Sequence, residues 1–160
     1  MGKINLSRVI LGGIVAGIVI DVFEGILHGA ILASQWAEVL AGLGKSGTMS
    51  AKQIVAFNVW GLAVGILTVG LYAAIRPRFG AGPKTATCAA IVMWIASALL
   101  PNLSMMWATG LFGRRLTLYS TLGALLEMLV GTLVGAALYK EPQLAPAPVA
   151  TAKVGQTAQA

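Results

Sequence analysis

Four long apolar segments dominate the chain, and each is long enough to cross a lipid bilayer. They cover about residues 9–33, 53–75, 85–108 and 116–139. A helix rises about 1.5 Å per residue and the hydrocarbon core is roughly 30 Å thick, so a run of 18 or more apolar residues predicts a transmembrane helix. We therefore expect an all-α protein, an integral membrane four-helix transmembrane bundle that forms one domain over residues 1–140.

The composition agrees with a chain that faces lipid. Residues are 58% hydrophobic and only 10% charged, whereas soluble domains average about 25% charged residues. The formal net charge is +6, but the basic residues lie near the ends of the apolar segments. We therefore expect the lipid bilayer and its anionic headgroups as partners, and no nucleic acid.

The connections between the segments differ in character. A polar, Gly-rich connection is expected from Gln35 to Lys52. In the third segment Pro101 either ends the helix or kinks it, and we favour a kinked span that continues to Trp107. After Lys140 the chain becomes rich in Ala, Pro, Gln and Thr, and we expect a disordered polar tail over residues 141–160.

The distribution of Lys and Arg predicts the orientation in the membrane. With four spans, both termini and the middle connection share one side of the membrane. Seven basic residues lie on that side and four on the other. The positive-inside rule therefore places the N- and C-termini in the cytoplasm. The seven are Lys3, Arg8, Arg76, Arg78, Lys84, Lys140 and Lys153, and the four are Lys45, Lys52, Arg114 and Arg115.

Three ionisable residues interrupt the first apolar segment: Asp21, Glu24 and His28. Their spacing of three and then four places them on one helical face. Gly13 and Gly17 fall on the same stripe, as does Gln35 beyond the span. Small residues four apart let helices approach closely. We therefore expect this face to point at other helices, and such faces also make homo-oligomers plausible.

The fourth segment carries one ionisable residue, Glu127, on a face of small side chains. Counted from opposite membrane surfaces, Asp21 lies about 18 Å deep and Glu127 about 16 Å deep, at 1.5 Å per residue. Asn58 in the second segment comes to a height near His28, and Asn102 reaches a similar level if the third span continues. We expect a polar cluster in the outer half of the bundle.

Such a cluster would need its charge balanced. No Lys or Arg lies inside any span, and charged groups in the membrane interior are costly unless they are paired. The balance could come from bound protons, a protonated His28 or a metal cation. The proton- or ion-binding candidates are Asp21, Glu24, His28, Asn58 and Glu127. Glu24, His28 and Glu127 are weak candidates for metal ligands, because their spacing matches no familiar metal motif. The sequence identifies no cofactor.

Several functions fit this pattern. The leading hypothesis is a proton- or cation-handling, transporter-like protein. The alternative is a non-catalytic structural or lipid-binding subunit of a larger membrane complex, in which buried carboxyl groups only hydrogen-bond across helices. A membrane enzyme that uses the same carboxyls as acid and base is a third hypothesis. We favour a protein that is not an enzyme and assign no catalytic residue, because no catalytic or nucleotide motif is present.

The middle connection reads RPRFGAGPKTA from Arg76 to Ala86. Its two prolines, Pro77 and Pro83, are expected to stop helices, with glycines between them for a tight turn. Arg76, Arg78 and Lys84 are expected to face lipid headgroups or to set the topology. The longer phrase LYAAIRPRFGAGPKTA, residues 71–86, resembles a group of small bacterial four-span membrane proteins. The resemblance implies a bacterial inner-membrane protein, and it brings no established activity or functional residue.

Overall fold

A computed structural model describes residues 4–141 of the chain. The part it describes is all helical, with four helical rods long and apolar enough to span a membrane, as the sequence predicts. Two of the rods change pitch along their length, so the rods comprise more than four elements. The elements are α1 (Leu6–Ile26), η1 (Leu27–Ile31), α2 (Ala33–Gly42), α3 (Ala51–Phe79), α4 (Pro83–Trp94), η2 (Ile95–Leu99), α5 (Leu100–Trp107) and α6 (Arg114–Leu138).

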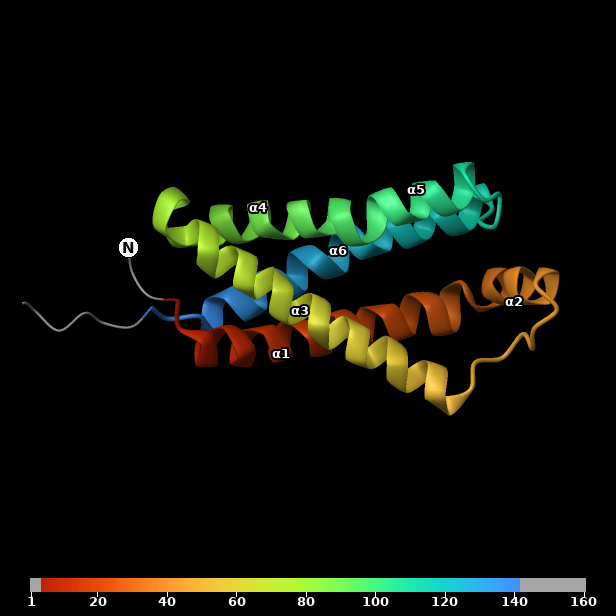
Figure 1. Cartoon of the computed structure of the whole chain (residues 1–160), viewed down its shortest axis with the longest axis horizontal. Coiled ribbons are helices and arrows are strands. Elements are labelled where there is room, and N and C mark those ends of the chain that lie inside the picture. The colour runs from red at the N-terminus through yellow and green to blue at the C-terminus, as the bar shows by residue number, and fades with distance from the viewer. Residues whose placement is uncertain (1–3, 142–160) are drawn as a thin grey trace, which may run out of the picture.

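The four rods run antiparallel along the chain (Figure 1). The start of α1, the α3–α4 turn and the end of α6 lie at one end of the bundle, and α2 and the α5–α6 loop lie at the other. We call the first the tyrosine end, because it holds Tyr72 and Tyr139, and the second the α2 end. The expected polar tail falls almost wholly on residues 142–160, outside the described part of the chain.

The third rod continues past Pro101, as the kinked-span prediction required. Residues 95–99 form one π-helical turn, η2, and Pro101 then stands in the first turn of α5. A proline lacks the N–H that a helix interior needs and its ring crowds the preceding turn. The wider π turn directly before Pro101 gives the ring room, so the helix reaches Trp107.

Two expectations about the connections are wrong. The connection expected from Gln35 to Lys52 begins as helix, because residues 33–42 form α2, and only residues 43–50 link α2 to α3. Pro77 does not stop its helix either. It lies in the last turn of α3, and the helix ends at Gly80, whose φ of 86° lies in the left-handed region that favours glycine. Pro83 begins α4 in the first turn, where its missing N–H leaves no bond unmade.

Glycines bring α1 into backbone contact with its neighbours. A Cβ atom on Gly17 would lie 2.6 Å from the Cα of Leu62 in α3, and one on Gly12 would lie 2.5 Å from the carbonyl oxygen of Gly135 in α6. Real side chains do not approach so closely, so only glycine fits at these positions. The predicted small-residue face of α1 does point at other helices, and α1 packs against both α3 and α6.

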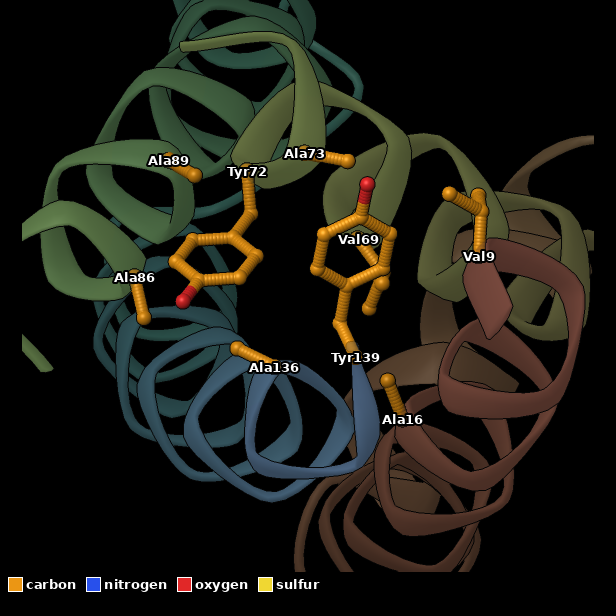
Figure 2. Close-up of a cluster of buried hydrophobic side chains, with 9 residues drawn as sticks. All are labelled: Val9, Ala16, Val69, Tyr72, Ala73, Ala86, Ala89, Ala136 and Tyr139. Carbon is orange, nitrogen blue, oxygen red and sulfur yellow. The ribbon is translucent and has the colours of Figure 1, made fainter. Parts of the chain in front are cut away.

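The tyrosine end is closed by a compact apolar core (Figure 2). Tyr72 and Tyr139 meet edge to face, with ring centroids 6.0 Å apart, among small side chains from all four rods. The Tyr139 hydroxyl accepts a hydrogen bond from the Asn5 N–H (3.4 Å), and the Tyr72 hydroxyl accepts one from Gly82 (3.3 Å). These bonds tie the ends of the rods together.

Towards the α2 end the rods separate. The buried residues of α1 end at Ile20 and those of α4 end at Ala90, while those of α3 begin only at Gly61. Every residue from 51 to 60 of α3 is exposed, and Figure 1 shows this part of α3 leaning away from α5. Only α6 keeps buried residues along its whole length. The bundle is therefore closed at one end and splayed at the other.

The glycine contacts predict a difference between two positions on the same helix. We expect Gly17→Ala to lower the free energy of unfolding by about 1–3 kcal/mol, because the added methyl group would press on the backbone of α3. Gly25→Ala is the matched control, since a Cβ there meets nothing within 4 Å. Helix loss on titration with denaturing detergent, followed by circular dichroism, measures both. Equal stability of the two variants would contradict this packing.

Candidate functional site

The splayed half of the bundle encloses a cavity of about 660 Å³. Side chains from α1, η1, α2, α3, η2, α5 and α6 line it, together with the loop before α3. All the residues predicted from the sequence to bind a proton or an ion line this cavity. They are Asp21, Glu24, His28, Asn58 and Glu127, and Asn102 joins them.

Glu127 is the deepest acidic group of the site. Only 3% of it is exposed, and it lies on the α6 face that also carries Ser120 and Ala124. Its carboxyl group lies next to that of Glu24, and its Oε2 atom has no hydrogen-bond partner among the described residues. The acidic groups of the first and fourth rods thus meet inside the bundle, as their heights predict. Two carboxyl groups can share a hydrogen bond only when a proton lies between them, since a carboxylate oxygen only accepts.

Glu24 also approaches His28 one turn further along. The Nε2 atom of His28 lies 3.4 Å from Oε2 of Glu24. The His28 side chain is 16% exposed and that of Glu24 is 41% exposed, so Glu24 faces the open part of the cavity. Glu127, Glu24 and His28 therefore form a row that leads from the buried α6 face towards the α2 end.

Trp36 fixes the state of the His28 ring, a role that no sequence pattern indicated. The indole N–H of Trp36 donates a hydrogen bond of 2.7 Å to Nδ1 of His28. An indole nitrogen can only donate, so Nδ1 carries no proton in this arrangement and the single ring proton sits on Nε2, facing Glu24. His28 is then neutral and does not supply the positive charge considered from the sequence.

Asp21 lies nearest the closed half, against Gly61 of α3. A Cβ atom at Gly61 would collide with the Asp21 carboxyl group, so this glycine provides the space that the carboxyl occupies. Asp21 is half-buried and lines the cavity. It marks the level at which α1 changes from small to polar side chains.

The two asparagines occupy opposite walls. Asn58 is exposed and donates to the carbonyl oxygen of Ile54 in its own helix (2.8 Å). Asn102 donates to the hydroxyl oxygen of Thr121 in α6 (3.2 Å). Neither amide contacts a carboxyl group through a hydrogen bond in the described structure, so both contribute to the lining and not to the acidic row.

Both π-helical turns lie at the cavity. His28 is the second residue of η1, and Ser97 and Ala98 of η2 line the opposite wall. A π turn shifts the register of everything beyond it. For this reason Gln35 leaves the acidic stripe, where regular 100° steps placed it, and bonds instead to Ser34 (3.1 Å). Trp36 takes the inward position next to it.

The donors do not form a metal centre. Among residues 4–141 no three His, Cys, Asp or Glu side chains are grouped so that they could hold a metal ion. Glu24, His28 and Glu127 follow one another in a row, whereas a metal needs its ligands to converge on one point. The metal candidates drawn from the sequence therefore do not come together as a ligand set.

The basic residues of the middle connection lie far from the site, at the tyrosine end. Arg76 pairs with Glu141 (3.5 Å) and lies over the ring of Tyr139. This partly internal role was not expected for a residue assigned to lipid headgroups. Arg78 and Lys84 are exposed, and their contact with headgroups or role in topology stays a prediction.

Comparison of the chain with protein-family models, with curated proteins and with solved structures finds no match. The site must therefore be interpreted from its own geometry and chemistry.

The contact between Trp36 and His28 predicts one tautomer. His28 is the only histidine in the chain, so selective ¹⁵N-histidine labelling reports on it alone when the affinity tag contains no histidine. At neutral pH we expect a neutral ring with the proton on Nε2. Trp36→Phe removes the donor and should let the proton populate both nitrogens. An imidazolium spectrum in the unchanged protein, or the same spectrum in Trp36→Phe, would contradict this assignment.

Proposed function

We propose that the protein is a small, transporter-like integral membrane protein that binds a proton or a cation at the pair formed by Glu24 and Glu127. The observation that supports this most directly is the burial of Glu127, only 3% of which is exposed, next to a second carboxyl group. An intramembrane ionisable residue is a functional candidate by default, because leaving it there is costly.

The surroundings of the pair favour exchange of positive charge. No Lys or Arg is among the described residues that line the cavity, and the Trp36 contact keeps His28 neutral. The negative charge can therefore be balanced by a proton held between the two carboxyl groups or by a cation that replaces it. Glu24 is open to the cavity and Glu127 is not, so charge would reach the buried carboxyl through the exposed one.

The shape of the bundle supports access from one side at a time. The cavity lies in the splayed half, while the tyrosine end is sealed by the core around Tyr72 and Tyr139. Moving charge across the membrane then requires a second state in which the tyrosine end opens. A non-catalytic subunit of a larger complex would need no such state, and it is the outcome we infer if no transport is found.

We further propose that the protein resides in a bacterial inner membrane with both termini in the cytoplasm. The excess of basic residues at the tyrosine end supports this orientation, and the resemblance of residues 71–86 supports the bacterial source. In this orientation the cavity would open towards the outer surface of the membrane.

Transport can be tested in vesicles that contain a pH-sensitive dye, with gradients of protons, Na⁺ and K⁺ imposed in turn. We expect at least one gradient to produce flux above that of empty vesicles, and Glu127→Gln to reduce it at least about tenfold by removing the group that carries the charge. Glu38→Gln is the control, because Glu38 is an exposed acid on α2 that does not line the cavity. Absence of flux under every gradient would point to the subunit hypothesis.

Orientation can be tested by labelling single cysteines in a Cys88→Ala background. We expect Thr48→Cys, in the loop between α2 and α3, to react with a membrane-impermeant maleimide in intact spheroplasts. Ala81→Cys, in the turn between α3 and α4, should react only after lysis, since it lies at the end with more basic residues. The reverse pattern would place the termini outside.

A further inference from the structure

The size and lining of the cavity indicate more than a site for a bare ion. We infer that its ligand is an amphiphilic monocation, an apolar organic body that carries one positive charge, held with its charge at Glu127. This inference rests on the proposed function, since it names the class of cation that the acidic site would take.

The charge of the ligand follows from the acidic groups. Two oxygen atoms on the cavity lining have no hydrogen-bond partner among the described residues: Oε2 of Glu127 and the hydroxyl oxygen of Ser120. Both residues are almost completely buried, and Glu127 is an acid. Buried polar atoms normally have hydrogen-bond partners, and a buried carboxylate needs a positive one. Asp21 and Glu24 on α1 add negative charge, and the lining within residues 4–141 contains no Lys or Arg.

The size of the ligand follows from the volume. A cavity of about 660 Å³ falls within the roughly 300–1,000 Å³ typical of small-molecule sites. A bare metal ion needs several oxygen or nitrogen ligands at about 2.0–2.6 Å around one point. The described residues offer no group of three such side chains, so the cavity is far too large and its donors too dispersed for an ion alone.

The apolar part of the ligand follows from the walls. Trp36 and Phe112 meet edge to face, with ring centroids 5.3 Å apart, and Trp36 also packs on His28. Phe57 and Trp60 of α3 also line the cavity. Aromatic walls accept apolar groups and attract a cation through their faces, while a few polar groups fix its orientation.

The splayed part of α3 offers a route from the bilayer. Residues 51–60 are exposed throughout, although Ile54 and Phe57 among them also line the cavity. Figure 1 shows this part of α3 diverging from α5, which carries the opposite wall at Asn102. An apolar cation dissolved in the membrane can enter there. A phospholipid headgroup fits less well, because the lining that the structure describes has no basic residue for its phosphate.

The inference can be tested with radiolabelled tetraphenylphosphonium, an apolar monocation, and protein in phosphatidylcholine nanodiscs. We expect saturable binding by the unchanged protein and by Glu38→Gln, and an affinity at least about tenfold lower in Glu127→Gln, equivalent to about 1.4 kcal/mol. Triphenylphosphine, an uncharged compound of similar shape, should not displace the label. This competition needs no variant, so it decides the question even if Glu127→Gln does not fold.

Each outcome bears on a different conclusion. Binding that Glu127→Gln leaves unchanged while that variant keeps its helix content, or that triphenylphosphine displaces, would overturn the inference, because apolar contact alone would then explain it. Flux of protons, Na⁺ or K⁺ through Glu127 without tetraphenylphosphonium binding would overturn the inference and leave the proposed function standing. Tetraphenylphosphonium binding without flux would support the ligand class and remove the transport part of the proposal.

Discussion

The close approach of α1 to α3 and α6 is the contact on which the rest of the structure depends. In membranes helices gain little from apolar side chains that lipid could solvate equally well, so close packing of backbones supplies much of the association. Gly13 and Gly17 bring α1 against α3, and Gly12 brings it against α6. Because a Cβ at any of these positions would collide with a backbone atom, these contacts fix both the depth and the rotation of α1.

That fixed rotation determines where the acidic side chains point. One face of α1 carries small residues as far as Gly17, and then Asp21, Glu24 and His28 along the next turns. The face that presses against its neighbours in the closed half therefore becomes the wall of the cavity in the other half. Once the side chains on this face are larger and polar, the helices can no longer approach, and they separate. The same face of α1 therefore explains both why the helices pack closely at the tyrosine end and why they separate at the α2 end.

Much of this arrangement could be predicted from the sequence because it depends on length and period. Apolar length located the four rods, the rise per residue brought Asp21 and Glu127 to similar depths, and four-residue spacing identified the packed face of α1. What was missed depends on departures from the regular helix. The π turn at residues 27–31 rotates the chain beyond it, which moves Gln35 away from the stripe and Trp36 towards His28.

The remaining features need tertiary contacts that no local pattern encodes. Neither the helical state of residues 33–42 nor the survival of α3 through Pro77 could be predicted, because a proline in a last turn and a short helix at a span end are decided by what surrounds them. The cavity likewise depends on where the rods separate. Sequence could place the acidic residues near one another, but it could not show how much space they enclose or which aromatic side chains face them.

The division into a packed half and an open half also determines which helix movements cost little free energy. Separating α1 from α3 in the closed half would break the backbone contacts that only glycine permits. It would also disrupt the apolar core around Tyr72 and Tyr139. Moving the first ten residues of α3 breaks little, because all of them are exposed. Elements with few buried contacts are the ones that open at low cost in free energy. A ligand that enters the cavity is therefore expected to close the start of α3 over itself before it disturbs the glycine contacts, so the acidic pair can be shielded from one side while the tyrosine end stays sealed.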